Sequence, residues 1–268
     1  MPEDEARWGA LNVAFATASG NIRRNNLSDF THIKRNGKIA MKLQDGDDLV
    51  GVMPCNETDD VLLATRDGKA IRFGVDAVRV FRGRDSTGVR GIRLLANDRV
   101  VSMSVITDDS NQFILSVTEN GYGKRTPIDD YRRSGRGGQG VANIETSERN
   151  GKVMASFAVV DDDQLMLVTN MGQVIRIRVH GGEGDSIRIA SRKTQGVRLF
   201  DVADDDNEKV VSAGLVRETE DDNNSASADG EVSDGVGDTH SPNTSNTANE
   251  DIKNELPGRD EPNEDNPA

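Results

Sequence analysis

The sequence predicts an all-β, propeller-like fold of about four blades with four strands in each blade. Three observations support it: two glycine-centred phrases recur four times, the period is about fifty residues, and the runs between the phrases are short and rich in Val, Ile and Thr. A fixed long period indicates an array of supersecondary units. Four short strands per period are typical of a propeller blade, and the weak helical periodicity argues against a helical repeat.

The first phrase marks a hairpin in each repeat. It reads FATASGNIRR, LATRDGKAIRF, SVTENGYGKRT and LVTNMGQVIRI, and its glycines are separated by 48, 53 and 51 residues. In the second copy the runs 61–65 and 70–73 flank an Asp-Gly pair, which favours a tight turn because both residues tolerate positive φ. The glycines of the four turns are Gly20, Gly68, Gly121 and Gly172.

The second phrase follows each hairpin and reads KRNGKIAMKL, GRDSTGVRGIRL, GRGGQGVANI and SRKTQGVRLF. In the second repeat we expect further strands at 91–95 and 100–106, and the latter has counterparts at 49–53, 153–160 and 210–216. The resulting blades span about residues 10–58, 59–110, 111–163 and 164–218. The aromatic residues expected in their core are Phe15, Phe73, Phe113 and Phe157.

Charge divides the chain into a body and a tail. Residues 219–268 carry 14 acidic and 2 basic residues, a net charge of −12 out of −13 for the whole chain, so residues 1–218 are near −1. The segment has no aromatic residue and few aliphatic ones. It cannot bury enough apolar surface to offset the entropy of ordering, so we predict a disordered acidic tail after a folded domain at 1–218.

Composition argues against several kinds of site. Cys55 is the only cysteine, so no intrachain disulfide can form, which fits a reducing cytoplasm. The 3 histidines are far apart and have no cysteines nearby, so we expect no metal site. The longest strongly apolar run, 153–160, is far shorter than the ~20 residues of a membrane span. We therefore expect a cytoplasmic protein with no membrane partner.

Basic residues cluster around the second-phrase glycine in every repeat. Glycine lets backbone N–H groups approach a phosphate, and arginine offers a planar fork that matches phosphate oxygens. Few aromatic residues are interleaved, so the pattern favours binding to the backbone of double-stranded DNA over base stacking on single strands. The candidate DNA contacts, three per repeat, are Lys34, Arg35 and Lys38; Arg82, Arg84 and Arg90; Arg132, Arg133 and Arg136; and Arg192, Lys193 and Arg198.

The same charges could instead be solvated loop residues with local acidic partners, such as Asp85 beside Arg84. Four clusters in register favour the DNA hypothesis, because blades arranged around an axis place equivalent loops on one edge. A duplex laid on that curved strip must bend. Bending by 40–90° over 20–30 base pairs costs on the order of 1–6 kcal/mol, which several phosphate contacts can offset.

One stretch extends the pattern to a known family. Residues 119–144 read ENGYGKRTPIDDYRRSGRGGQGVANI, and related phrases are RRNNLSDF at 23–30 and GRDSTGVRGIRL at 83–94. Through these phrases the body of the chain resembles the C-terminal domain of DNA gyrase A, part of a type IIA topoisomerase. The resemblance implies a β-pinwheel, a propeller variant of six blades in which neighbouring blades exchange a strand.

The resemblance also implies a function and partners. The family domain wraps double-stranded DNA around its basic rim and presents it to the cleavage core of gyrase A. The holoenzyme then introduces negative supercoils with ATP bound by gyrase B. Carried over here, the DNA contacts are the loop residues above, with Arg132, Arg133 and Arg136 foremost, and in addition Lys124 and Arg125.

The chain departs from the family in three respects. It has four repeats instead of six, and Met1 corresponds to a point after the second family blade. The family box of type QRRGGRG belongs to the first family blade, which this chain lacks, and SGRGGQG at 134–140 is only a degenerate relative of that box. Neither Tyr122 nor Tyr131 lies in the family's nucleophile context, and no GxxxxGK[ST] phosphate loop occurs. We therefore expect no cofactor, strand cleavage or ATP hydrolysis in this chain, with ATP and Mg²⁺ used elsewhere in the holoenzyme.

Two alternatives stay open at this point. The C-terminal domain of topoisomerase IV uses fewer blades and has more degenerate loops, although the long phrase at 119–131 favours gyrase. A propeller that acts as a protein-interaction scaffold is compatible with the near-neutral body. Binding to relaxed plasmid, scored for the handedness of wrapping, separates the DNA hypotheses from the scaffold.

The acidic tail leads to the first testable prediction. Either the tail only solvates the protein, or its carboxylates compete with DNA for the basic loops. The competition hypothesis predicts that deletion of residues 219–268 tightens DNA binding, because it removes a net charge of −12 that repels or competes with DNA. Filter binding of the full-length and truncated chains at equal salt measures the difference. Equal affinities would mean that the tail is inert.

Overall fold

The computed structural model describes residues 5–31, 33, 35–83, 85–107, 111–182, 186–202 and 207–216. The acidic tail and two predicted DNA contacts, Lys34 and Arg84, lie outside these residues. The described strands are β1 (Asn12–Thr17), β2 (Asn21–Asn26), β3 (Leu49–Cys55), β4 (Asp60–Thr65), β5 (Lys69–Gly74), β6 (Val89–Arg90), β7 (Val100–Ile106), β8 (Phe113–Thr118), β9 (Tyr122–Pro127), β10 (Val141–Ala142), β11 (Val153–Val159), β12 (Gln164–Thr169), β13 (Val174–Arg178), β14 (Val197–Arg198) and β15 (Val210–Val216).

Helical structure in the described ranges is limited to short 3-10 helices. These are the 3-10 helices η1 (Glu5–Ala10), η2 (Leu27–Phe30), η3 (Val75–Ala77) and η4 (Ile128–Asp130). None of the described helices has the length and apolar character that a membrane crossing requires. The all-β prediction is therefore confirmed.

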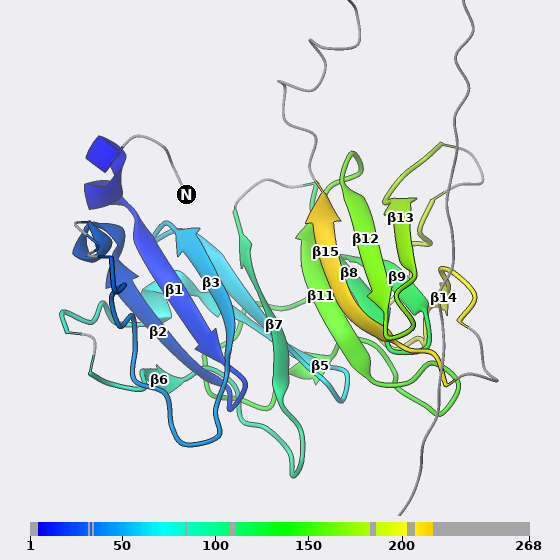
Figure 1. Ribbon diagram of the computed structural model, residues 1–268, viewed down its shortest axis with the longest axis horizontal. Helices are drawn as coiled ribbons and strands as arrows, with labels where there is room; N and C mark the ends of the chain where they lie inside the picture. Colours follow the sequence, from blue (N-terminus) through cyan, green and yellow to red (C-terminus); the bar gives the residue numbers. More distant parts are fainter. Residues whose placement is uncertain are drawn as a thin grey trace, which may run out of the picture. The chain divides into compact units, whose positions relative to one another are not determined.

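The strands form four antiparallel sheets that follow one another along the chain (Figure 1). Their strand orders are β3-β1-β2-β6, β10-β5-β4-β7, β11-β8-β9-β14 and β13-β12-β15. Each sheet is built on the hairpin predicted from the first phrase, and the last strand of the repeat pairs with the first strand of that hairpin. This arrangement is the predicted propeller-like array of blades.

The outermost strand of each four-stranded sheet comes from the next repeat. Strand β6 pairs with β2, β10 with β5 and β14 with β9, each over two residue pairs. The expectation that residues 91–95 form a strand of their own blade was wrong, because the strand lies at Val89–Arg90 and joins the preceding sheet. Local pattern cannot reveal this, since a strand looks the same whichever sheet receives it.

A glycine directly before each exchanged strand permits the close approach of the two repeats. Gly88, Gly140 and Gly196 have φ angles of +86°, +72° and +78°. A Cβ at Gly140 would lie 2.3 Å from the carbonyl oxygen of Ala70 on β5, and a Cβ at Gly88 would lie 2.4 Å from that of Ile22 on β2. Both the left-handed backbone and the contact exclude a side chain. The second-phrase glycine therefore joins neighbouring blades.

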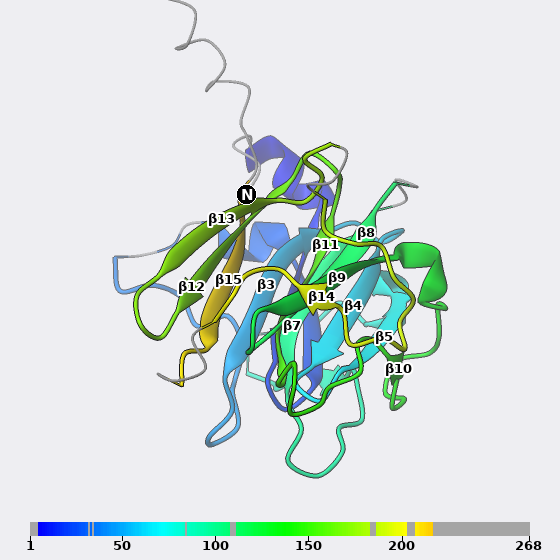
Figure 2. The ribbon, with the colours of Figure 1, turned by 90° about the vertical axis from the view of Figure 1, so that its right-hand side faces the viewer.

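Adjacent sheets pack through the last strand of each repeat. Strands β3, β7, β11 and β15 contact one another in that order (Figure 1). Figure 2 views the same sheets with the fourth sheet, which holds β12, β13 and β15, toward the viewer. Of the predicted core aromatic residues, Phe15 and Phe73 are buried. Phe113 and Phe157 are partly buried and pack against the apolar cluster shared by the third and fourth sheets. Burial of such side chains contributes roughly 1.5–3 kcal/mol each when complete, and less for these two.

A repeated arginine of the second hairpin strand lies at each seam between repeats. Isolated parallel bridges join Arg24 to Val80, Arg72 to Arg133 and Arg125 to Ile189. The guanidinium of Arg72 pairs with Asp60 at 2.7 Å and donates to the carbonyl oxygen of Ile128 at 3.2 Å. Buried guanidinium groups need such partners because an unpaired buried charge is costly. Arg72 therefore links its own hairpin to the next repeat across the seam.

Two predicted DNA contacts, Lys124 and Arg125, belong to this seam. Lys124 is fully buried, and its Nζ donates to the carbonyl oxygens of Ser191 (2.5 Å) and Arg192 (2.9 Å). Arg125 is 3% exposed and forms an ion pair with Asp161. The structure thus contradicts the expectation that these two side chains contact DNA, because neither reaches the surface.

The exchanged-strand glycine gives a stability prediction with a matched control. Gly140 and Gly37 both have positive φ, +72° and +76°, but only Gly140 has backbone of a neighbouring repeat within 4 Å of a built Cβ in the described structure. Gly37→Ala should cost about 1–2 kcal/mol from the left-handed backbone alone. Gly140→Ala should lower the free energy of unfolding by more than that in urea titrations. Equal losses would contradict the role of the contact.

The buried lysine predicts a pH dependence of stability. Burial and the nearby Arg192 lower the pKa of Lys124 from 10.5 to about 8. Between these values the unfolded chain binds more protons than the folded chain, so the free energy of unfolding should rise as the pH increases from about 8 to 10.5. Urea unfolding across this window should show that Lys124→Met removes the rise. The exposed Lys193→Met is the control and should retain it; equal profiles for the two variants would refute the assignment.

Candidate nucleic-acid interface

The second-phrase loops of the second and third repeats are in direct contact. The backbone N–H of Gly137 donates to the carbonyl oxygen of Gly91 over 2.6 Å. In return, the N–H of Arg93 donates to the carbonyl oxygen of Gly138 over 2.8 Å. Reciprocal backbone bonds fix the two loops relative to each other, since both partners belong to the main chain.

Arg136 reinforces this contact with its side chain. Its guanidinium donates to the carbonyl oxygens of Ala77 and Arg90, each at 3.0 Å. Arg136 itself remains exposed. The residue therefore joins η3, the exchanged strand β6 and the third-repeat loop, and it keeps its positive charge at the surface.

The loops of the third and fourth repeats are joined in the same way. The guanidinium of Arg192 donates to the carbonyl oxygen of Ala142, and the side-chain amide of Asn150 donates to the carbonyl oxygen of Gln195, both at 3.0 Å. Residues 85–93, 132–144 and 191–198 thus form a continuous series, which we call the loop strip. The structure brings three of the four predicted basic clusters together.

Several predicted contacts on or near the loop strip are exposed cations with no side-chain ion pair or hydrogen bond to any described residue. Such side chains keep their donors available for an added anion. They are Arg82, Arg90, Arg132 and Lys193. Arg35 of the first repeat is likewise exposed and has no side-chain ion pair or hydrogen bond to a described residue.

Two other predicted contacts are exposed but paired. Arg133 is 54% exposed and forms ion pairs with Asp60 at 2.9 Å and Asp76 at 3.3 Å. Arg198 is 57% exposed and forms an ion pair with Asp201. The partners Asp76 and Asp201 are exposed, and such pairs contribute roughly 0–1 kcal/mol, so a phosphate can replace these two carboxylates at modest cost. Asp60 is buried, so Arg133 also compensates the charge of a buried carboxylate.

The first predicted cluster has a different setting. Lys38 is exposed, and its Nζ donates to the carbonyl oxygens of Asp29 (2.5 Å) and Thr31 (3.4 Å) within its own repeat. Among the described residues, no hydrogen bond links this loop to the loop strip. The prediction of four clusters in one continuous series is therefore met for three of them.

Sequence analysis missed two exposed arginines. The seam bridges make Arg79, Arg132 and Arg188 structurally equivalent, because each directly precedes the bridged residue. All three are exposed and follow a buried anchor, which is Val78, Tyr131 or Ile187. In the sequence, the three positions share an apolar residue directly followed by an arginine, and the arginines are 53 and 56 residues apart. This pattern lay outside the second phrase and was therefore overlooked.

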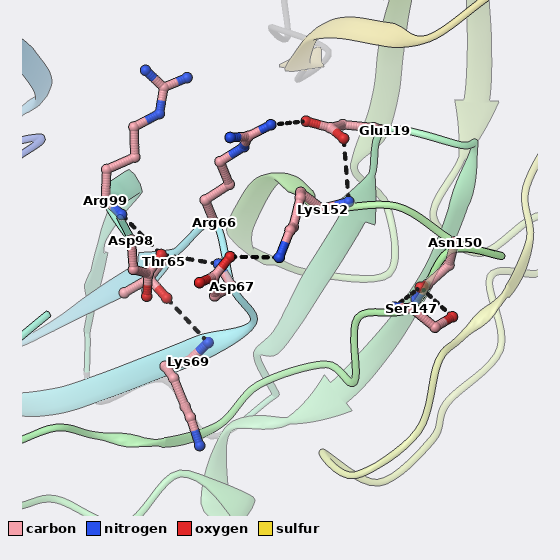
Figure 3. A network of polar contacts seen from close by, with 10 residues as sticks. All are labelled: Thr65, Arg66, Asp67, Lys69, Asp98, Arg99, Glu119, Ser147, Asn150 and Lys152. Carbon is pink, nitrogen blue, oxygen red and sulfur yellow. Dashed lines mark hydrogen bonds and ion pairs between the residues drawn. The ribbon is translucent and has the colours of Figure 1, made fainter. Parts of the chain in front are cut away.

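The hairpin turns carry cations of a different kind (Figure 3). Arg66 forms an ion pair with Glu119 at 3.0 Å, and Lys152 forms one with Asp67 at 2.8 Å. Glu119 also accepts from the backbone N–H of Lys152 at 3.3 Å. These pairs join turns of neighbouring repeats and neutralise the cations that take part in them.

The two tyrosines are engaged within the protein. Tyr131 is buried and donates to Oδ1 of Asn143 at 2.6 Å, and burial raises its pKa above the usual value. The Tyr122 hydroxyl accepts from Arg198 at 3.2 Å and from Arg149 at 3.4 Å, which lowers its pKa. In the described ranges, no three or more His, Cys, Asp or Glu side chains gather as metal ligands.

Comparison with solved structures identifies two domains of similar fold. The C-terminal domain of DNA topoisomerase IV has a TM-score of 0.69 at 24% identity, with 77% of this chain and 62% of that chain covered. The DNA gyrase A C-terminal domain has a TM-score of 0.66 at 25% identity, with 77% and 66% covered. The first likeness concerns the fold alone.

Sequence comparison is more specific. DNA gyrase A of Rickettsia bellii is 40% identical over 269 residues, which cover 83% of this chain and 29% of the relative. The chain thus spans about three tenths of that relative's length. The family model described as DNA gyrase C-terminal domain, beta-propeller, matches residues 12–56, 59–107, 112–159 and 163–217. The resemblance noted in the sequence is confirmed, and the chain belongs to the DNA gyrase A C-terminal domain family.

Proposed function

We propose that this chain binds and wraps double-stranded DNA as part of DNA gyrase A, in support of ATP-dependent negative supercoiling by the holoenzyme. The loop strip carries the proposal. Three repeats place exposed cations without acidic partners among the described residues, Arg90, Arg132 and Lys193, in loops that are hydrogen-bonded in series. A contact repeated at regular intervals suits the regular spacing of phosphates along a duplex.

The chemistry of the loop strip suits backbone binding. Guanidinium groups pair with phosphate oxygens through two parallel N–H donors. The exposed glycines Gly135 and Gly138 leave backbone of the third loop uncovered by side chains. Contacts to phosphates position a protein on DNA without reading base sequence. We therefore infer that the chain binds DNA of any sequence, and that bending rather than base readout decides its preferred sites.

The longer relatives suggest partners for this activity. The chain covers 29% of a gyrase A relative, so strand cleavage and ATP hydrolysis are assigned to other parts of the enzyme. In this proposal the cleavage core of gyrase A receives the wrapped DNA, and gyrase B supplies ATP hydrolysis with Mg²⁺. The chain itself needs no cofactor to bind DNA, and it acts in the cytoplasm.

Wrapping is tested by ligating nicked plasmid in the presence of the chain. Wrapping of one hand is expected to shift the linking number in proportion to bound protein. DNA binding without any shift would leave a binding domain that does not wrap. No binding at low salt would favour the protein-interaction scaffold instead.

The interface prediction compares two exposed arginines. Log K should fall with log salt by ~0.9 for each phosphate neutralised. Arg132→Ala, in the loop strip, should weaken binding at low salt and reduce that slope by about one contact, because a phosphate partner is lost. Fluorescence anisotropy with a duplex at several salt concentrations measures both quantities.

Arg99→Ala is the matched control. It removes the same charge from an exposed arginine that lies beside the hairpin-turn network and points away from it (Figure 3). It should leave the salt slope unchanged. Equal effects of the two variants would mean that net charge, and not the loop strip, determines affinity.

A further inference from the structure

The residue directly before the seam arginine differs between the three seams, which we number in chain order. These residues are Arg23, Ile71 and Lys124, and all three are buried. Arg23 donates to the carbonyl oxygen of Ser86 at 2.7 Å, so a buried cation holds the incoming loop in the first seam. Lys124 does the same in the third seam through its bonds to two loop carbonyl oxygens. In the second seam the equivalent side chain, Ile71, is apolar and offers no donor.

A second difference lies in the incoming loop itself. The position two residues before the exchanged-strand glycine is Ser86 in the second repeat, Gly138 in the third and Thr194 in the fourth. The hydroxyl groups of Ser86 and Thr194 take part in hydrogen bonds. Gly138 has no side chain, and a Cβ built on it would lie 3.6 Å from Cδ1 of Ile71. The second seam thus lacks both the buried cation and the loop side chain of its neighbours.

A cavity of about 310 Å³ lies at this place, between β5 and the loop of the third repeat. The residues that line it include Ile71 and Arg72 of β5 and Arg132, Gly138 and Gln139 of the loop. Two arginines and no acidic residue line this cavity, whereas the cavity around Arg82 in the first seam also contains Asp85. The cavity of the second seam therefore favours an anion.

The cavity also contains unused hydrogen-bond donors. The guanidinium of Arg132 has no ion pair or hydrogen bond to any described residue. The N–H groups of Gly135, Gly138 and Gln139 are bonded to no described acceptor, and all three residues are exposed. Arg72 differs, because Asp60 already neutralises it at 2.7 Å. A free guanidinium beside glycine-flanked backbone N–H groups is a donor set that suits phosphate oxygens.

We propose that this cavity binds one phosphate group, which accepts from the guanidinium of Arg132 and from N–H groups of the glycine-rich loop. The inference rests on the proposed function where the phosphate belongs to the DNA backbone. A free phosphate ion offers the same oxygens, and two experiments separate these sources. A DNA phosphate held here fixes the position of the duplex at the second seam, because the neighbouring seams hold their loops with buried cations of their own.

Gly138→Ser tests the site, because it gives the third loop the side chain that the second loop has at Ser86. The new side chain points toward Ile71 and occupies part of the cavity without changing the net charge. Duplex binding should weaken at low salt. The slope of log K against log salt should decrease in magnitude by ~0.9, because one phosphate contact is lost. Fluorescence anisotropy at several salt concentrations measures both quantities.

Gly83→Ser is the matched control. Gly83 is exposed, has nothing described within 4 Å of a built Cβ, and is not among the residues that line this cavity. The control should keep the affinity and the slope of the wild-type chain. Urea unfolding checks that Gly138→Ser is folded, and the smaller change Gly138→Ala replaces it if it is not. A wild-type slope in the folded Gly138 variant would exclude a DNA phosphate from the cavity.

Titration with inorganic phosphate in the absence of DNA tests the free ion. At constant ionic strength, the amide resonances of Gly135 and Gln139 should shift saturably in the wild-type chain and should not shift in Gly138→Ser. Chloride in place of phosphate is the control for a general salt effect and should cause no saturable shift.

The two experiments together decide the source of the phosphate. A reduced slope with amide shifts means that the cavity accepts either source, and a reduced slope alone identifies the DNA backbone. Amide shifts alone identify a site for free phosphate. Neither effect would overturn the proposal. If the wild-type chain does not bind DNA, the proposed function fails, and the phosphate titration still decides whether the cavity is an anion site.

Discussion

The fold depends on one constraint, the exchange of a two-residue strand between neighbouring repeats. Each exchanged strand completes the sheet of the preceding repeat and not the sheet of its own repeat. The glycine directly before it has a positive φ and brings the two backbones into contact. In the described structure, each four-stranded sheet therefore contains strands of two repeats. The glycines, the seam arginines and the apolar faces of the sheets all act at the same boundary. A hairpin alone is marginal in water, so this shared boundary is what makes the repeats stable together.

The exchange also determines which cations are available to a partner. Residues of the second hairpin strand face the incoming loop, so Lys124 and Arg125 are covered and bonded to carbonyl oxygens. Residues of the incoming loop face outward, so Arg90 and Arg132 are exposed. Cations therefore have two roles in each repeat. Those inside hold the seam, and those outside form the loop strip.

The net charge of residues 1–218, which is near −1, does not reveal this division of the cations into buried and exposed groups. Carboxylates such as Glu119 and Asp67 are placed at the hairpin turns, where they pair with Arg66 and Lys152. Loop-strip residues such as Arg132 have no such partner among the described residues. A sum over residues 1–218 near −1 is thus compatible with a locally positive surface. Local potential, and not net charge, attracts a polyanion to such a surface.

The sequence by itself determined the repeat, the hairpins, the turn glycines and the family, because each depends on local spacing and turn chemistry. Only the tertiary structure decided which sheet receives Val89–Arg90, which basic residues are buried, and that Arg79 and Arg188 are equivalent to Arg132. These features arise from contacts between residues about fifty positions apart. The sequence pattern around a lysine in a strand is the same whether the side chain faces water or the neighbouring blade. The burial of Lys124 therefore follows only from the assembled blades.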